Sequence, residues 1–203
     1  ADLDELRIAI LDTGVSPTRF VATAWASAST FRQTDKRGGA NGARIALSPQ
    51  KEWAANEPEE LEKTLAALAS VRQVFNASEG RAAKISLADL IVFAGGVGVE
   101  QAASQAGHAV KVQFTPGRTD ATEDITDADS FAVLEPTADG FRNYLAGEHE
   151  RTPEELLIDR AHFLSLSVPE MTALVGGLRS IGVNQSNTSL TTKSGHLTNE
   201  WFL

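Results

Sequence analysis

The sequence of 203 residues has no cysteine, one methionine and few aromatic residues, which make up 6% of the chain. The lack of cysteine excludes disulfide bonds, thiolate nucleophiles and cysteine-ligated metal sites. No apolar run approaches the roughly 20 residues that span a bilayer, and the N-terminus has no signal-peptide pattern. We therefore expect a cytoplasmic protein that does not bind membranes.

Positive charge is also scarce. The chain has 18 lysine and arginine residues against 27 aspartate and glutamate residues, a formal net charge of -9. An acidic surface repels the phosphates of nucleic acids, so nucleic acid is not an expected partner.

The composition favours a helical protein. The chain is long enough to bury a core, and its hydrophobic fraction of 42% and charged fraction of 22% are ordinary for a globular protein. Alanine, the best helix former, is abundant. Capping residues and apolar spacing predict helices that begin near Asp2, Ser16, Pro58, Ser86, Thr152 and Ser167. The predicted fold class is all-α with long ordered loops.

The predicted loops lie at residues 33–56 and 116–136, and alternation of Val110, Val112 and Phe114 predicts a short extended segment between them. The helix after Ser86 contains three glycines, which would each cost about 1 kcal/mol relative to alanine. We expect these glycines, Gly95, Gly96 and Gly98, to allow the close approach of a neighbouring helix or backbone.

No catalytic, cofactor-binding or metal-binding residue is predicted from the residues alone. The four histidines, for which we expect structural or surface roles, lack ligand spacing: His108, His149, His162 and His196.

The glycines of 95–98 do not follow a strand as a dinucleotide fingerprint does, and those of 38–42 lack the ending of a phosphate loop. An acidic group lacks calcium-loop spacing and comprises Glu123, Asp124, Asp127 and Asp129. Arg118 and Asp120 could pair locally or form a turn, and we assign them no chemistry.

Three N-glycosylation sequons occur, at Asn76, Asn184 and Asn187. Chance explains them if the chain is cytoplasmic, although they leave a secreted form open.

One stretch carries a family resemblance. Residues 22–32, ATAWASASTFR, and the Gly-rich residues that follow are similar to the distal-helix motif R-x-x-W-H of haem peroxidases. Trp25 is kept, whereas Ala22 stands at the arginine position and Ala26 at the histidine position. Further blocks, at 85–91, 114–122, 130–136 and 138–144, resemble catalase-peroxidases in order along the chain.

The resemblance implies the haem-free C-terminal domain of a bifunctional catalase-peroxidase, with a haem-peroxidase-like helical fold. Residues 173–182 match the family's proximal helix, and Arg179 stands where that helix has its iron-binding histidine. Arginine stays protonated and offers iron no lone pair. The resemblance thus implies that residues 1–203 form one non-catalytic domain, which we also expect to be truncated at its C-terminal end because the family continues past Leu203.

By the same resemblance, the parent protein decomposes hydrogen peroxide by catalase and peroxidase activity. Haem b and the crosslinked Met-Tyr-Trp cofactor would belong to its N-terminal domain, which this chain would support within a homodimer. The alternative is a stand-alone helical binding module with a small-ligand cavity in place of the haem pocket. The small residues that would leave such a cavity are Ala22, Ala26, Gly176 and Gly177.

Overall fold

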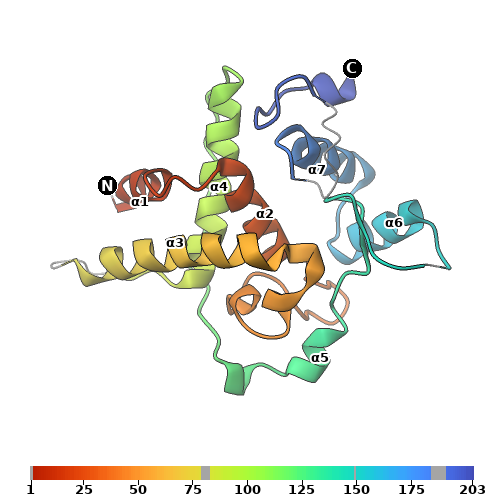
Figure 1. Cartoon of the computed structure of the whole chain (residues 1–203), viewed down its shortest axis with the longest axis horizontal. Coiled ribbons are helices and arrows are strands. Elements are labelled where there is room, and N and C mark those ends of the chain that lie inside the picture. The colour runs from red at the N-terminus through yellow and green to blue at the C-terminus, as the bar shows by residue number, and fades with distance from the viewer. Residues whose placement is uncertain (1, 79–82, 149, 184–190) are drawn as a thin grey trace.

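The computed structural model describes residues 2–78, 83–148, 150–183 and 191–203. Within these ranges the fold is built from α-helices, with one two-stranded antiparallel sheet. The long helix α4 runs through the middle, with α1 on one side and α6 and α7 on the other (Figure 1). The predicted all-α class is confirmed.

The first two helices begin where the sequence predicts. Helix α1 spans Asp2–Leu11, and Gly14 beyond it adopts a φ of 74° that favours glycine. Helix α2 spans Pro17–Ala28, with Pro17 in its first turn and the hydroxyl of Ser16 accepting a hydrogen bond from the N–H of Arg19.

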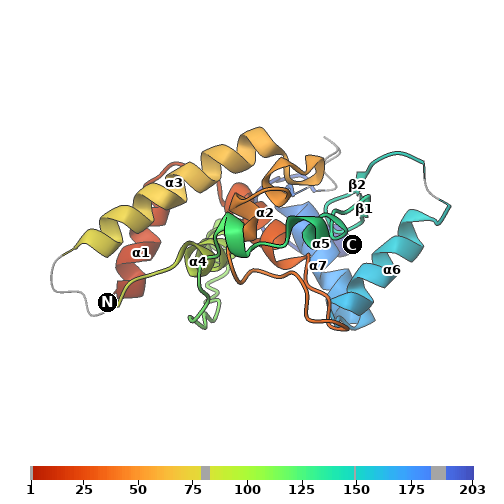
Figure 2. The same ribbon diagram turned by 90° about the horizontal axis from the view of Figure 1, so that it is seen from below.

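Helices α3 (Pro58–Ala77) and α4 (Leu87–Gln105) form the core with α1 and α2. Helix α3 packs across α1 and α4, as Figure 2 shows from below. A salt bridge of 2.8 Å from Arg7 to Glu100 joins α1 to α4. Burial acts to raise the pKa of the Glu100 carboxyl, but bonds from Arg7 and from the N–H of Val112 outweigh it and lower this pKa.

Helices α2 and α4 approach so closely that glycine is required at the crossing. A Cβ atom added at Gly95 would lie 2.4 Å from the Cβ of Ala24, and one added at Gly98 would lie 2.6 Å from the carbonyl oxygen of Pro17. Helix α4 continues through all three glycines. The prediction that these glycines allow a close helix approach is confirmed at Gly95 and Gly98.

The predicted loops contain short helical turns. The first loop includes three 3-10 turns, η1 (Arg44–Ala46), η2 (Gln50–Glu52) and η3 (Ala54–Asn56), and a cis peptide bond before Pro49. The second includes η4 (Glu123–Ile125) and helix α5 (Ala128–Ala132). No strand forms at residues 110–114, because the N–H of Val112 bonds to the Glu100 side chain, at 2.9 Å, rather than to a neighbouring strand.

The last part of the chain begins with a hairpin. Strands β1 (Ala138–Asp139) and β2 (Tyr144–Leu145) pair, and helices α6 (Pro153–Phe163) and α7 (Val168–Ser180) follow, with η5 (Glu200–Phe202) near the end. Glu155 and Thr152 exchange capping bonds at α6, and the Glu170 carboxylate accepts from the N–H and hydroxyl of Ser167 at α7. Both predicted helix starts are confirmed.

Helix α4 is also long and apolar enough, by length and composition, to cross a membrane. The expectation that no apolar segment approaches this length was therefore wrong. Most of the helix is buried within the protein, and the core helix of a soluble protein passes the same test, so this is weak evidence of a membrane span.

The crossing of α2 and α4 gives a test with a matched control. We expect Gly95→Ala to destabilise the fold by about 1–3 kcal/mol, because the new methyl group must displace α2. Gly96→Ala is the control, since its Cβ would lie 3.3 Å from a movable Val112 methyl group, and it should be neutral or gain up to about 1 kcal/mol from helix propensity. Urea unfolding followed by tryptophan fluorescence measures both, and equal effects would contradict the crossing described.

Candidate functional site

The motif residues of α2 lie in two different surroundings. Ala26 is buried, and its carbonyl oxygen accepts a hydrogen bond of 3.0 Å from Nε2 of Gln50. Ala22 is partly buried and packs against a second hydrophobic cluster that includes residues of α7. Neither position carries a group that could move a proton or stabilise a charge.

Trp25 packs within this second cluster. Its ring lies 4.9 Å, centroid to centroid, from that of Phe141, which is fully buried and comes from the turn between β1 and β2. The same cluster contains Val175, Leu178 and Ile181, from α7 and its end. The space between α2 and α7 is therefore occupied by side chains, among them Trp25 and Phe141.

Arg179 lies on α7 and reaches the same hairpin turn. Its Nη2 atom donates to the carbonyl oxygen of Gly140 at 3.2 Å, and its Nε atom is buried without a partner among the described residues. The guanidinium has only donors, so it acts here as a bridge between α7 and the hairpin.

Sequence reasoning missed a buried ion pair beside Ala22 and Ala26. The carboxylate of Asp139 and Nε of Arg142 lie 2.8 Å apart, and each side chain is 5% exposed. Asp139 also accepts from two backbone N–H groups, and Nη1 of Arg142 donates to Oδ1 of Asn56 at 2.9 Å. The spacing of three residues within Asp139–Arg142 was the available signal, but the tie to Asn56, 86 residues away, leaves no trace in the sequence.

A second arginine lies close to this pair. Nη1 of Arg160 donates to the carbonyl oxygen of Ser29 at 3.3 Å. Burial lowers the pKa of the Arg160 guanidinium, and the charge of Asp139 acts in the opposite direction. An arginine stays protonated despite such a shift, so this is a fixed positive charge rather than a proton carrier.

The cavities beside Ala22 and Ala26 are small. One of about 40 Å³ is lined by Ala22 together with polar residues that include Asn56 and Arg142. A second of about 10 Å³ is lined by Ala26, and it also borders Asn56 and Arg142. Sites for small molecules usually measure about 300–1,000 Å³, so these spaces are of the size that holds water.

The other two small residues predicted to line a ligand cavity are covered. A Cβ atom added at Gly176 would lie 2.6 Å from Trp201 and 2.4 Å from Phe202, and Leu197 lies 3.8 Å from the equivalent point at Gly177. The structure therefore does not bring Ala22, Ala26, Gly176 and Gly177 together around one cavity of ligand size. A larger open groove of about 550 Å³ runs along α3, and none of the four lines it.

The residues between α2 and α7 do not fit a haem group. Haem iron in peroxidases is held by an imidazole, and the position on α7 that would supply one carries Arg179. His108 and His162 are exposed and His196 is half-buried, each on a different segment, while His149 lies outside the described residues. Trp25 and Phe141 occupy the space between the helices.

The other predicted candidates have local structural roles. Within the described ranges, no three histidine, aspartate or glutamate side chains lie together as a metal site would require. Asp127 of the acidic group caps α5 by accepting from the N–H of Ser130 at 3.1 Å. The glycines of 95–98 lie inside α4, and those of 38–42 form turns with positive φ.

Arg118 and Asp120 join the segment after α4 to the start of that helix. The buried carboxylate of Asp89 accepts from the backbone N–H of Arg118, at 3.1 Å, and from its Nη1, at 2.9 Å. Asp120 accepts from the N–H groups of Leu87 and Ala88 at the helix start, where negative charge is favourable. Local pairing was one of the two predicted options, and Nη1 of Arg118 does donate to the carbonyl oxygen of Thr115 at 2.9 Å, whereas the partners named above are distant in sequence.

Asn76 is the one sequon that the structure describes; Asn184 and Asn187 lie outside the described residues. Its amide nitrogen donates to the carbonyl oxygen of Ile85 and its amide oxygen accepts from the N–H of Ile85, each at 2.9 Å. A glycan on this nitrogen would disturb the first of these bonds, so the amide is better suited to joining the end of α3 to the residues just before α4.

Comparison with known proteins identifies the family. The model of the family described as Peroxidase matches residues 5–200, so the chain belongs to the peroxidase family.

The relatives are more specific. Over its full length the chain is 59% identical to a catalase-peroxidase of Acidiphilium cryptum, 57% identical to one of Gloeobacter violaceus and 58% identical to one of Streptomyces reticuli. The chain spans 28% of the length of each of these relatives. The resemblance to part of a catalase-peroxidase is confirmed.

The buried ion pair gives a second test. Asp139→Asn should destabilise the protein by about 3–5 kcal/mol, because it leaves the Arg142 charge buried without its carboxylate. Asp4→Asn is the control, since Asp4 is 71% exposed and its bond to Arg7 should be worth at most about 1 kcal/mol. Urea unfolding measures both, and similar small losses would show that the Asp139 pair does not hold the hairpin.

Proposed function

We propose that this chain is the C-terminal, haem-free domain of a catalase-peroxidase and that it acts by packing rather than by catalysis. One observation carries the proposal. Ala22, Ala26 and Arg179 occupy the three positions to which the family resemblance assigns peroxide and iron chemistry, and the space between their helices is filled by Trp25 and Phe141.

The extent of the similarity supports a domain of a larger protein. Each relative is matched along the whole of this chain but over only 28% of its own length. The remaining part of such a protein would contain the N-terminal domain with haem b, where hydrogen peroxide is decomposed. This chain would support the arrangement of that active site and contribute to a homodimer.

The alternative, a stand-alone module with a ligand cavity in place of the haem pocket, has less physical support. The spaces beside Ala22 and Ala26 measure about 40 and 10 Å³, and Gly176 is covered by aromatic side chains. A ligand between α2 and α7 would have to displace Phe141, which is fully buried.

A haem titration tests the absence of iron chemistry. We expect added haem to give no Soret band typical of histidine ligation and no peroxide turnover, because the α2–α7 space lacks an imidazole. Ala26→His is a matched variant: it restores one imidazole in that region but leaves Arg179 and Phe141 in place, so it too should fail to bind haem stoichiometrically. A stoichiometric histidine-ligated spectrum of the unaltered chain would overturn the proposal.

The supporting role is tested in the longer protein that contains this chain. Removing these 203 residues should lower catalase and peroxidase activity and alter the haem absorption spectrum, because the active site loses its packing support. Asp139→Asn in the same protein should reduce activity in proportion to the unfolded fraction of this domain. Full activity after removal would show that the domain has another role.

A further inference from the structure

One buried hydrogen-bond donor near Ala26 is unsatisfied. Trp53, between η2 and η3, is 3% exposed, and its Nε1 atom has no partner within the part of the chain that the structure describes. A buried indole N–H normally has a hydrogen-bond partner, because a donor that is removed from water and finds no acceptor loses a hydrogen bond that is not replaced.

The side chain of Trp53 lines the cavity of about 10 Å³ described above. This volume is close to the minimum for one water molecule and too small for a larger ligand. The lining is partly polar, with Ser29, Asn56 and Arg142 beside the indole. A polar cavity of this size is the kind that holds a bound water, whereas empty cavities are apolar.

The neighbouring polar groups are bonded to one another. Asn56 accepts from Arg142 at 2.9 Å and donates to the carbonyl oxygen of Gln50 at 2.8 Å. Gln50 in turn donates to the carbonyl oxygen of Ala26 at 3.0 Å. These bonds fix Asn56, Arg142 and Ala26, which line the cavity with Trp53.

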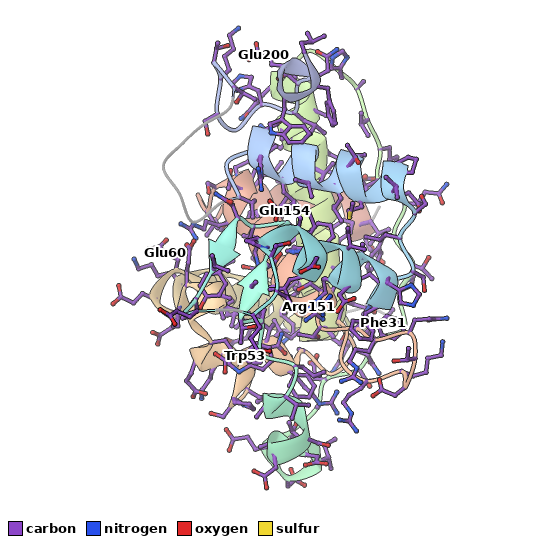
Figure 3. The ribbon with its side chains drawn as sticks, turned by 90° about the vertical axis from the view of Figure 1, so that its right-hand side faces the viewer. Phe31, Trp53, Glu60, Arg151, Glu154 and Glu200 are labelled. Carbon is purple, nitrogen blue, oxygen red and sulfur yellow. The ribbon has the colours of Figure 1, made fainter. Side chains whose placement is uncertain are left out.

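We propose that this cavity is a binding site for one structural water molecule, which accepts a hydrogen bond from Nε1 of Trp53. The cavity lies where the end of α2, the turn η3 and the segment that follows α5 meet, because residues of all three line it. Trp53 also stacks on Phe131 of α5, with ring centroids 6.1 Å apart. In Figure 3 it lies between the hairpin and α5.

The short side chain of Ala26 leaves room for this water. Ala26 is 4% exposed and lines the cavity, so a longer side chain there would enter the same space. The site therefore lies beside one of the positions at which the family motif is changed, and it does not depend on the proposed function.

Trp25 provides an internal control. Its Nε1 atom is also buried without a partner among the described residues, but Trp25 lines neither this cavity nor the one of about 40 Å³. The two indole groups thus differ in whether they line one of these two cavities.

Nuclear magnetic resonance of the unaltered chain, with nitrogen-15 in its tryptophans, tests the proposal. We expect a cross-relaxation peak between water and the Trp53 indole proton, with the sign of a long-lived bound water, and no such peak at Trp25. The signals are assigned from contacts to ring protons, with Trp53→Phe and Trp25→Phe as checks. No peak at Trp53, or equal peaks at both residues, would overturn the proposal.

A filling variant tests the location. Ala26→Val should remove the Trp53 peak, and an unchanged peak would place the water elsewhere. If this variant does not fold, a high-resolution crystal structure of the unaltered chain decides instead. Density within about 2.7–3.2 Å of Nε1 supports the site, and a cavity without density refutes it.

Discussion

The close contact between α2 and α4 determines which side of α2 faces α4 and which side the rest of the domain packs against. At Gly95 and Gly98 the two helices approach closely enough to exclude a Cβ atom. One face of α2, with Phe20 and Ala24, is therefore held against α4. Ala22 and Ala26 each line a small cavity that borders Asn56 of η3 and Arg142 of the hairpin turn, and Ala26 also packs in the core cluster that includes α4. The crossing thus positions the motif residues, whatever chemistry they carry.

The turn between β1 and β2 packs against α2. Phe141 lies against Trp25, Arg142 reaches Asn56, and Gly140 accepts from Arg179. A single turn of the chain thus links α2, η3 and α7. The buried pair of Asp139 and Arg142 holds this turn, and burying two charges is tolerable only because each has further hydrogen bonds.

Local signals made the helices predictable. Ser16, Ser86 and Thr152 cap helices where their sequence context indicates, because the capping bonds span only three residues. The site could not be predicted in the same way. The residues that fill the space around Ala22 and Ala26 come from segments up to about 160 positions away, as the packing of Val183 near Ala22 shows, and nothing near them in the sequence specifies that contact. The family resemblance located the changed positions, and only the structure shows what surrounds them.

The small side chain of Ala22 has a small energetic cost in this arrangement. Residual cavities destabilise a protein by about 24 cal/mol per Å³, so a cavity of 40 Å³ costs about 1 kcal/mol, and less where water satisfies its polar walls. Filling by Phe141 and Trp25 keeps the remaining space from being larger. A domain of this size can tolerate that cost, since its stability depends on the α2–α4 crossing and the hairpin. The same packing leaves little space between α2 and α7 for a group as large as haem, which is what the proposed packing role requires.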